Sequence, residues 1–273
     1  MITAKNTVYH NNKAVSELLE MVYRHKGWDF RNYKRTSISR RISRRLNTHN
    51  ISSYKDYSDI LRKDPAEYEK LLSTVTIKVS EFFREPDVFD LLKETITSEL
   101  SDTRELKAWC CGCAYGEEAY SLGILLNECM EHKNLQNTKI FATDIDDNAL
   151  NIARDGTYKE EFIKNVGSPI MGKYFIKVDK GYRIKYSIRN MVRFGRLDIV
   201  TNAPLSKVDI LFCRNLLIYF DNDLQETVFK KLNFALKPGG ILVLGKAERP
   251  PSLFLPLYRE IGKRSRIYRK EQL

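Results

Sequence analysis

A glycine-containing acidic segment has the residue types needed to hold a small ligand at the start of a helix. It spans residues 112–118 (GCAYGEE) and follows a short apolar run. Glycines at a strand-to-helix turn let a ligand approach the backbone, and a helix N-terminus offers free N–H groups. The segment lacks the third glycine of a dinucleotide fingerprint and the Gly-Lys-Ser/Thr of a phosphate loop. Its two carboxylates would repel phosphate, so a cationic or neutral ligand is favoured.

A second acidic segment, residues 143–146 (TDID), ends the next apolar run. An acidic side chain at that place can accept hydrogen bonds from both hydroxyls of a ribose, which is the role we expect for Asp144. The alternative is that Asp144 or Asp146 caps the helix that follows. A ribose-bearing ligand with a positive end and no phosphate points to S-adenosylmethionine. Glu117 or Glu118 could then meet its amino or sulfonium group.

These segments need a scaffold that brings them together, and the pattern from about residue 105 predicts one. Short apolar runs typical of buried parallel strands alternate with amphipathic helices. The strand candidates are 106–111, 139–145, 191–197, 208–213 and 239–245. This order predicts right-handed crossovers and a doubly wound sheet, in which ligands bind beyond the carboxyl ends of the strands.

Two segments depart from the strand-helix alternation of this second part. Residues 157–190 are expected to form a small β insertion, with two short strands around Asp179-Lys180-Gly181. The basic segment 259–270 is expected to end the sheet as a hairpin.

The first 75 or so residues are predicted to form helices in succession. Apolar residues recur at helical spacing before Gly27, and Ile38, Ile42 and Leu46 lie four residues apart. Ser52 or Ser53 is a candidate helix cap, and Pro65 is expected near the first turn of the next helix.

The composition is that of a globular protein. Of 273 residues, 42% are hydrophobic and 30% are charged, which argues against a disordered or coiled-coil chain. No apolar stretch approaches the roughly 18 residues of a membrane helix, and the N-terminus lacks the apolar core of a signal peptide, so we expect a cytoplasmic protein. The five cysteines have neither the even number of a disulfide framework nor the spacing of a metal site.

The chain is basic, with 46 Lys and Arg against 35 Asp and Glu. A net charge of +11 predicts attraction to an acidic protein, a nucleic acid or an acidic membrane surface. Between residues 31 and 50 there are seven basic residues and no acidic one. If the apolar stripe of this helix is buried, Arg40, Arg41, Arg44 and Arg45 should face solvent, either as a docking surface or as an ordinary solvated face.

Five segments in order give a more specific resemblance. They are 79–85 (VSEFFRE), 116–121 (GEEAYS), 142–146 (ATDID), 212–221 (FCRNLLIYFD) and 236–240 (LKPGG). Together they resemble the chemotaxis receptor glutamate methyltransferases, the CheR-type family, from about residue 20 to the end. The resemblance implies an α/β class I S-adenosylmethionine-dependent methyltransferase domain, with a Rossmann-like doubly wound sheet and a small β insertion, preceded by an all-α N-terminal domain.

The resemblance also implies the reaction. A methyl group would pass from S-adenosylmethionine to glutamate side chains in the cytoplasmic helical domain of chemotaxis receptors, giving glutamyl methyl esters and S-adenosylhomocysteine. It implies no metal, no nucleic acid and no membrane insertion. The implied domains are a helical substrate-recognition domain at 1–75, a linker at 76–92 that contributes to the active site, and a methyltransferase domain at 93–273.

Site residues follow from the resemblance by position. The cofactor would be held by Ser80, Arg84, Glu118, Asp144, Asp198, Ile199, Asn215 and Leu216. Arg84 and Tyr219 would lie nearest the transferred methyl group. Arg41 and Arg44 match substrate-contacting arginines, and we assign Arg45 to the same surface.

Some residues depart from the family pattern, and other readings of the site residues remain. Lys78 and Asp198 stand where the family usually has Asn, Ala119 where it has Pro, and 245–248 (GKAE) where it has GHSE. Without the resemblance, Arg84 would be a surface ion-pair partner of Glu81 or Glu85, Tyr219 a core aromatic and Asn215 a helix cap.

Two rival functions stay open: a nucleic-acid methyltransferase, and a catalytically idle S-adenosylmethionine-binding signalling module. Base methylation at amino groups usually places Asn/Asp-Pro-Pro-aromatic after the fourth strand, where this chain has Arg214-Asn215-Leu216-Leu217. Cytosine C5 chemistry would need a Pro-Cys nucleophile, but Cys213 follows Phe212. Because the β insertion has a short turn, we expect receptor binding that does not depend on a receptor tail peptide.

Overall fold

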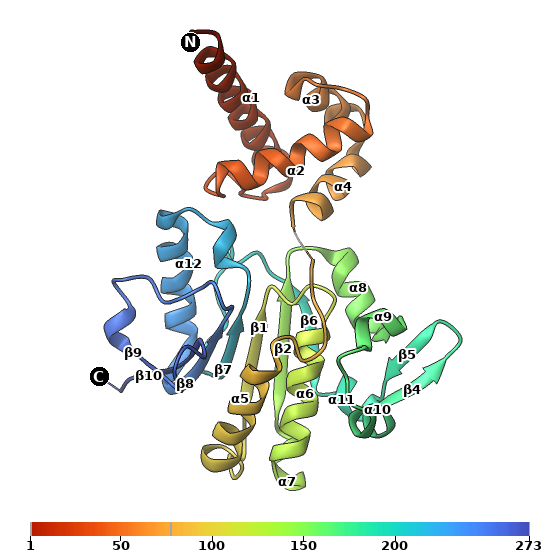
Figure 1. The fold of residues 1–273 in the computed structure, drawn as a ribbon, viewed down its shortest axis with the longest axis vertical. Helices are drawn as coiled ribbons and strands as arrows, with labels where there is room; N and C mark the ends of the chain where they lie inside the picture. Colours follow the sequence, from red (N-terminus) through yellow and green to blue (C-terminus); the bar gives the residue numbers. More distant parts are fainter. Residues whose placement is uncertain (1, 77, 273) are drawn as a thin grey trace. The chain divides into compact units, whose positions relative to one another are not determined.

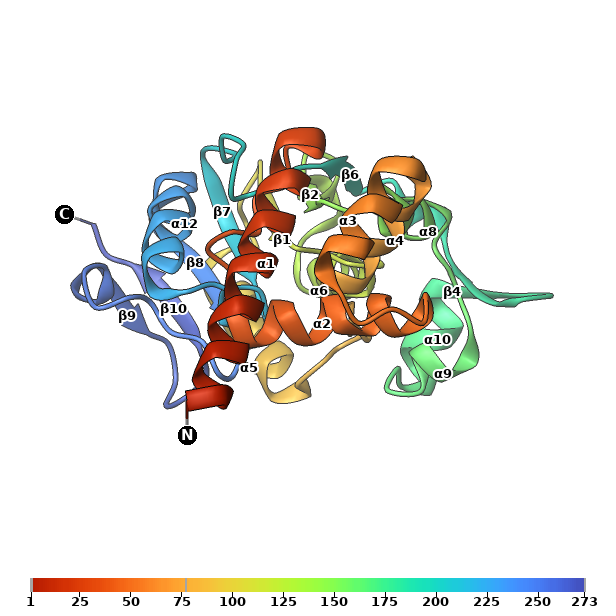
Figure 2. The same cartoon turned by 90° about the horizontal axis from the view of Figure 1, so that it is seen from above.

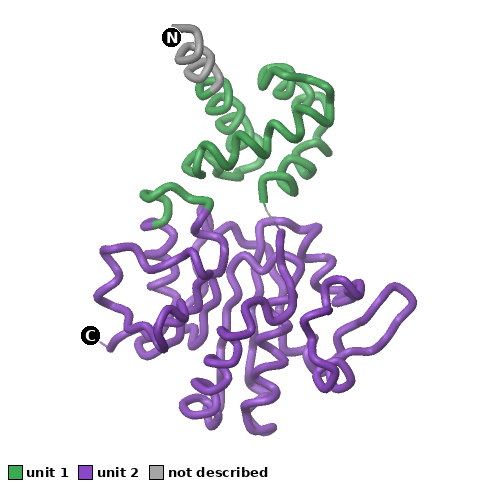
Figure 3. Tube along the Cα trace, viewed as in Figure 1, with its two compact units in different colours: residues 1–77, 219–225 green, residues 78–218, 226–273 purple. Residues whose placement is uncertain are grey.

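The computed structural model describes residues 2–76 and 78–272, with side chains described from residue 12 onward. The chain divides into two compact units (Figure 3). Unit 1 comprises residues 1–77 with 219–225, and unit 2 comprises residues 78–218 with 226–273.

Unit 1 is built on the predicted succession of helices. They are α1 (Ile2–Lys26), α2 (Arg35–Thr48), α3 (Tyr54–Lys63) and α4 (Pro65–Val75). Gly27, with a φ of 72°, ends α1 because its left-handed backbone cannot continue a helix. The side chain of Ser53 accepts hydrogen bonds from the N–H groups of Lys55 and Asp56, and Pro65 occupies the first turn of α4. Both predictions are therefore confirmed.

Unit 2 contains a mainly parallel sheet of the predicted kind (Figure 1). Among the described residues the strand order is β6-β2-β1-β7-β8-β10-β9. The parallel strands are β1 (Lys107–Cys111), β2 (Lys139–Asp144), β6 (Val192–Arg196), β7 (Val208–Cys213) and β8 (Leu236–Leu244). All five predicted strands are present. The expected C-terminal hairpin is also confirmed, as antiparallel β9 (Tyr258–Glu260) and β10 (Ile267–Lys270).

Helices cover both faces of this sheet, which explains why its strands are apolar on both sides. The two views together show α5 (Pro86–Glu99) and α6 (Glu117–Cys129) on one face and α12 (Asn222–Ala235) on the other (Figures 1 and 2). The remaining elements of this part are α7 (His132–Leu135), α8 (Asp147–Asp155), η1 (Leu217–Tyr219) and η2 (Leu255–Leu257). In the described part of the chain, no helix has both the length and the apolar character needed to cross a membrane.

The β insertion forms a separate small sheet that extends from the body of unit 2 (Figure 1). Its elements are β3 (Thr157–Tyr158), α9 (Glu160–Ile163), α10 (Ser168–Tyr174), β4 (Phe175–Val178), β5 (Gly181–Ile184) and α11 (Tyr186–Arg189). The predicted pair of strands is confirmed as β4 and β5. Sequence patterns missed β3, which has only two residues. Gly181 is required at the hairpin because a Cβ there would lie 2.2 Å from the carbonyl oxygen of Tyr158.

Candidate active site

The candidate site lies where three neighbouring parallel strands end. The order β2-β1-β7 places the carboxyl ends at Asp144, Cys111 and Cys213 along one edge of the sheet. The acidic segments of the sequence therefore follow adjacent strands. This is the edge at which open α/β sheets bind ligands.

Left-handed backbone gathers around this edge. Ala114 has a φ of 48° and Asn215 a φ of 57°, and in the segment 78–85 Phe83 has 50° and Glu85 has 63°. Such conformations are costly for residues other than glycine and concentrate at functional sites. Gly116, with a φ of 90°, has a packing reason as well, because a Cβ there would lie 2.8 Å from that of Ala153.

Asp144 and Asp146 have different tasks, which the sequence alone could not assign. The carboxylate of Asp144 accepts the N–H of Ala114 at 2.9 Å and that of Asp146 at 3.0 Å, and so joins the turns after β1 and β2. Asp146 caps α8 by accepting the N–H groups of Asn148 and Ala149. Burial raises the pKa of Asp144, although these backbone N–H groups and the nearby Lys78 oppose the rise.

Lys78 has a clear role in the folded chain. Its ammonium forms an ion pair with the carboxylate of Asp146, and the two side chains are 7% and 1% exposed. The cation therefore faces a carboxylate at the start of α8, which accounts for a lysine in a region expected to hold a cationic ligand. The pair also ties the start of the segment 78–85 to unit 2.

Arg214 connects parts of the candidate site through contacts that sequence reasoning missed. Its side chain is only 1% exposed and contacts Glu118 at 2.9 Å and Glu85 at 2.7 Å, and it also donates to the carbonyl oxygen of Arg84 at 3.0 Å. One guanidinium thus joins the start of α6, the start of α5 and the turn after β7. A lone basic residue at the end of a buried strand was the available signal, because a buried arginine must find carboxylates.

Arg84 does not form the surface ion pair that its neighbours suggested. Its guanidinium donates to the carbonyl oxygen of Val79 at 2.9 Å. Glu85 pairs with Arg214 instead, and Glu81 accepts a hydrogen bond from Asn165. Within the described ranges, no ion pair joins Arg84 to an acidic side chain.

Glu117 and Glu118 form the acidic part of the site. Glu117 is 1% exposed, and burial raises its pKa to about 7, while a hydrogen bond from Ser80 opposes the rise. In the described chain its Oε2 atom is buried without a hydrogen-bond partner. Burial also raises the pKa of Glu118, against the attraction of Arg214. Glu118 shares the guanidinium of Arg214 with Glu85, and among the described residues Glu117 has no ion-pair partner, so a bound cation would be stabilised.

The turn after β7 is held by Glu248. Its Oε2 atom accepts the N–H groups of Asn215 and Gly245, both at 2.8 Å. The side chain of Leu216 lies over Gly112, where a Cβ would come within 3.3 Å of it. The turns after β7 and β1 therefore pack together.

Asp198 organises its own loop. Its carboxylate accepts the N–H of Val200 and the hydroxyl of Thr201, at 2.9 and 3.1 Å. The carbonyl oxygen of Ile199 is held by the ammonium of Lys231 at 2.9 Å. Both oxygens of the Asp198 carboxylate thus accept hydrogen bonds within one turn. This is a structural reason for Asp at a position where the family usually has Asn.

Tyr219 and the basic helix α2 belong to unit 1. The guanidinium of Arg41 lies 4.4 Å from the centre of the Tyr219 ring, and it also donates to the carbonyl oxygen of Val75. Tyr219 is half-buried, and its carbonyl oxygen accepts the N–H of Lys34 at 2.8 Å.

The expectation that all four arginines of α2 face solvent is therefore wrong for two of them. Arg41 is 2% exposed, and Arg45 pairs with the buried Glu67 at 2.6 Å. Arg40 and Arg44 are exposed, as expected. The reason is that α4 and the segment 219–225 pack beside the apolar stripe of α2, so the residues that flank the stripe are covered as well.

Comparison with known families agrees with this geometry. Residues 78–254 match the model of the CheR methyltransferase SAM-binding domain, and residues 13–76 match that of the CheR methyltransferase all-alpha domain. The chain belongs to the CheR methyltransferase family. Its sheet domain has the class I methyltransferase architecture that the family resemblance implied, and the all-α part precedes it, as the resemblance also implied.

Individual CheR relatives are similar over most of this chain. It is 32% identical to a chemotaxis protein methyltransferase of Borreliella burgdorferi over 86% of this chain and 87% of the relative. It is 30% identical to chemotaxis protein methyltransferase 2 of Vibrio cholerae over 83% of this chain and 82% of the relative. A 104.1 kDa protein of Rhodobacter capsulatus is 31% identical over 86% of this chain. The match covers only 25% of that longer protein.

The residues at the CheR site fit the S-adenosylmethionine that the family's domain binds. The molecule has a positive sulfonium, an amino group and a ribose. The partnerless Oε2 of Glu117 and the paired Glu118 suit the cationic end, and Asp144 lies at the end of β2, where a ribose is held. Among the described residues, no cluster of three or more His, Cys, Asp or Glu side chains could hold a metal ion.

The raised pKa of Glu117 predicts a pH dependence of stability. The ordinary pKa of 4.5 becomes about 7 in the folded protein, so between these values the folded chain binds more protons than the unfolded chain. Stability contributed by this group therefore falls as pH rises from about 4.5 to 7. Relative to a Glu117→Gln variant, we expect the free energy of unfolding to fall by about 2–3 kcal/mol between pH 4.5 and 8.

Urea unfolding at several pH values would measure this difference. Comparison with the variant cancels the other buried carboxyls, such as Glu118 and Glu248, that are present in both proteins. Parallel stability curves for the two proteins would contradict the assignment.

Proposed function

We propose that this CheR methyltransferase transfers the methyl group of S-adenosylmethionine to glutamate side chains in the helical cytoplasmic domain of chemotaxis receptors. The observation that carries the proposal is that acidic side chains and a basic side chain lie near one another in unit 2. The buried Glu117 and the half-buried Glu118 suit the cationic donor, and the guanidinium of Arg84, which is near enough to Glu118 to lower its pKa, is held by a backbone carbonyl. The names of the chemotaxis relatives support the choice of substrate.

The chemistry requires alignment more than proton transfer. A glutamate carboxylate in water has an ordinary pKa well below neutrality, so it is ionised at neutral pH and needs no general base. When bound, S-adenosylmethionine supplies an electrophilic methyl group: the new O–CH₃ bond forms as the S–CH₃ bond breaks, and its electron pair stays on sulfur. The products are the glutamyl methyl ester and S-adenosylhomocysteine.

The chain's own residues would hold the two reactants in line. Glu117 and Glu118 retain the amino end of the donor, and Asp144 holds its ribose. Arg84 orients the incoming carboxylate, with its oxygen about 3–3.5 Å from the methyl carbon. The same task is assigned to the hydroxyl of Tyr219 from the family pattern alone. Asp198, Ile199, Asn215 and Leu216 would enclose the adenine and the middle of the donor.

The exposed part of α2 is the proposed docking surface for the acidic receptor helices. Arg44→Glu is expected to raise the KM for a receptor fragment about tenfold at low salt, because it replaces an attraction with a repulsion. Its affinity for S-adenosylhomocysteine should be unchanged. The effect should shrink as salt rises, since the Debye length is about 8 Å at 0.15 M salt.

Lys63→Glu is the matched control, because Lys63 is also exposed in unit 1 and the charge change is the same. A KM increase of equal size in this control would mean that net charge, rather than α2, attracts the receptor.

Methyl transfer from a radiolabelled donor tests the function itself. Purified protein, donor and receptor cytoplasmic fragments should give label that mild base releases as volatile methanol, as expected for a carboxyl methyl ester. Base-stable label on nucleic acid would support the first rival function. Donor binding without transfer to any receptor fragment would support the idle module.

The thiol chemistry of the site disfavours one form of the nucleic-acid rival, methylation at cytosine C5. A hydrogen bond with Cys111, together with burial, raises the pKa of Cys213 well above its ordinary value. Cys213 is fully buried, so it is a weak nucleophile. Methylation that begins with attack by a cysteine thiolate therefore has no suitable residue after β7.

A further inference from the structure

The loop that follows β6, residues 198–202, is held by a lysine from a helix later in the chain. Lys231 lies on α12, and its ammonium donates to the carbonyl oxygens of Ile199, Val200 and Asn202, at 2.9, 2.8 and 2.8 Å. A lysine ammonium has three protons, so this one loop uses all of them. The loop is therefore folded around a cation that belongs to the chain itself.

Hydrogen bonds within the loop close it around the ammonium. The N–H of Asp198 donates to Oδ1 of Asn202 at 2.9 Å, and the N–H of Asn202 donates to the carbonyl oxygen of Asp198 at 2.8 Å. Burial lowers the pKa of Lys231, and the nearby carboxylate of Asp198 opposes the fall. Without the ammonium, the three carbonyl oxygens that lie within 2.9 Å of its nitrogen would repel one another. The shape of the loop therefore depends on Lys231.

The same loop borders the candidate active site. Leu197, directly before the loop, donates its N–H to the carbonyl oxygen of Asp144 at 3.0 Å. Because β6 and β2 are neighbouring parallel strands, the loop begins at the edge of the sheet where ligands bind. A change in the shape of the loop would move Asp198 and Ile199, the residues expected to enclose the adenine, relative to the residue expected to hold the ribose.

We propose that Lys231 is a positioning residue for the methyl donor, because its ammonium fixes the loop 198–202 in the shape that receives the adenine. This inference rests on the proposed place of the adenine beside Asp198 and Ile199. Lys231 acts through the loop and not by touching the donor, since the three carbonyl oxygens already use its protons. Its loss should therefore weaken binding of the nucleoside part of the donor and leave the chemical step almost unchanged.

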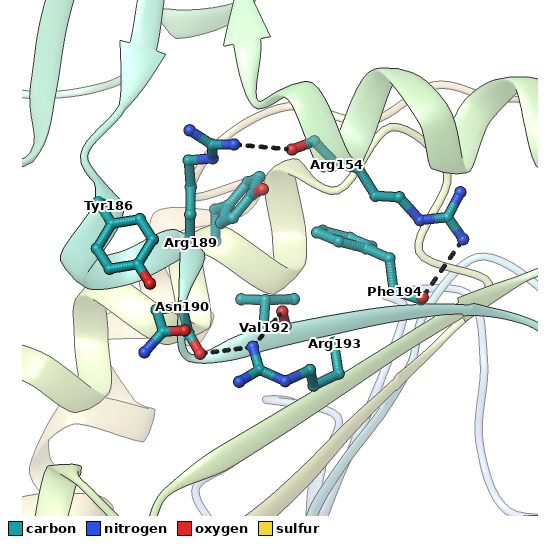
Figure 4. Close-up of a pocket in the computed structure, with 8 residues that line it drawn as sticks. Arg154, Tyr186, Arg189, Asn190, Val192, Arg193 and Phe194 are labelled. Carbon is teal, nitrogen blue, oxygen red and sulfur yellow. Dashed lines mark hydrogen bonds between the residues drawn. The ribbon is translucent and has the colours of Figure 1, made fainter.

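A purely structural role for Lys231 makes a different prediction, because cationic side chains also hold backbone carbonyls elsewhere along β6. Arg193 donates to the carbonyl oxygen of Asn190 at 2.7 Å, and Arg154 donates to that of Phe194 at 3.4 Å (Figure 4). If Lys231 served only to tie the chain together in this way, its loss would lower the free energy of unfolding. The folded protein would then keep its affinity for the donor.

Isothermal titration of the full chain with S-adenosylhomocysteine and with 5′-methylthioadenosine distinguishes the two roles. Methylthioadenosine has the adenine and the ribose of the donor but lacks its amino-acid end. Lys231→Met removes the ammonium and keeps a side chain of similar length, and it should weaken binding of both molecules at least about tenfold. Lys231→Arg keeps a cation with several donors, so it should recover part of the affinity. In methyl transfer by Lys231→Met, the KM for the donor should rise, while turnover at saturating donor should fall less than about threefold.

Lys270→Met is the matched control, because Lys270 is also half-buried and also holds backbone carbonyls. Its ammonium donates to the carbonyl oxygens of Asn233 and Leu236, at 2.6 and 2.9 Å. Leu236 begins β8, so this contact lies at the end of the sheet opposite to the candidate site. The control should bind both molecules as tightly as the unchanged chain does.

The proposal is overturned if folded Lys231→Met binds S-adenosylhomocysteine as tightly as the unchanged chain, or if the control loses as much affinity. Weaker binding of S-adenosylhomocysteine alone, with methylthioadenosine unaffected, would also overturn it, because the effect would then not pass through the adenine. If Lys231→Met does not fold, Lys231→Gln replaces it, since the amide keeps two donors, and both molecules should bind at least about threefold more weakly. The expected titrations without methyl transfer to receptor fragments would contradict the proposed function and leave this inference in place.

Discussion

Replacing Arg84 with alanine is expected to lower the turnover number for receptor methylation at least about a hundredfold, equivalent to roughly 2.7 kcal/mol of transition-state stabilisation. The guanidinium is anchored through Val79 and, among the described residues, forms no ion pair, so it has donors left for an incoming carboxylate. Affinity for S-adenosylhomocysteine should fall by less than about tenfold, because Glu118 and Asp144 are also assigned to hold that molecule, whereas only turnover needs the receptor carboxylate to be oriented.

Initial rates of label transfer to receptor fragments, together with calorimetry for the product, measure both quantities. Arg84→Lys keeps the charge but not the two-pronged donor geometry, and it should recover part of the rate. Tyr219→Phe should lose less than Arg84→Ala, because it removes a single hydroxyl. Unchanged initial rates in both Arg84→Ala and Tyr219→Phe would remove these residues from the catalytic role.

Replacing Arg214 is expected to have the second large effect, through positioning rather than contact with the reacting atoms. Arg214→Gln leaves the carboxylates of Glu85 and Glu118 without their buried cation, which costs about 3–5 kcal/mol of folding stability. Because that variant could unfold, Arg214→Lys is the more informative change. It keeps the charge but cannot reach both carboxylates and the carbonyl of Arg84 at once.

For Arg214→Lys we expect donor affinity and turnover each to fall about tenfold. A pH profile separates positioning from general loss of structure. With a poorer partner the pKa of Glu118 should rise further, so donor binding should become tighter as pH increases through neutrality. Arg269→Lys is the control, because Arg269 of β10 pairs with Glu99 at the end of α5, away from Glu85 and Glu118. Because Glu117 titrates in the same range in both proteins, the comparison is with the unchanged chain: a pH dependence of donor affinity that is no steeper in Arg214→Lys would contradict the positioning role.

Local patterns in the sequence were sufficient for most of the fold. The five apolar runs became β1, β2, β6, β7 and β8, because strands buried on both faces need continuous apolar residues. Caps such as Ser53 and stops such as Gly27 act through bonds to residues a few positions away, so they too can be read directly. The acidic segments after β1 and β2 also indicated the kind of ligand, because residue types within one short segment are enough to favour a cationic, ribose-bearing molecule.

Tertiary structure decided the tasks that depend on distant partners. Asp144 and Asp146 are equivalent as helix caps by sequence, and only the contact of Asp144 with Ala114 separates them. Lys78 contacts Asp146, which lies 68 positions away in the sequence, and Arg214 contacts Glu118, which lies 96 positions away. Burial of Arg41 likewise depends on Tyr219, far along the chain. A charged side chain becomes buried only where folding places a partner beside it. The spacing of residues along the chain does not predict which distant residues come into contact.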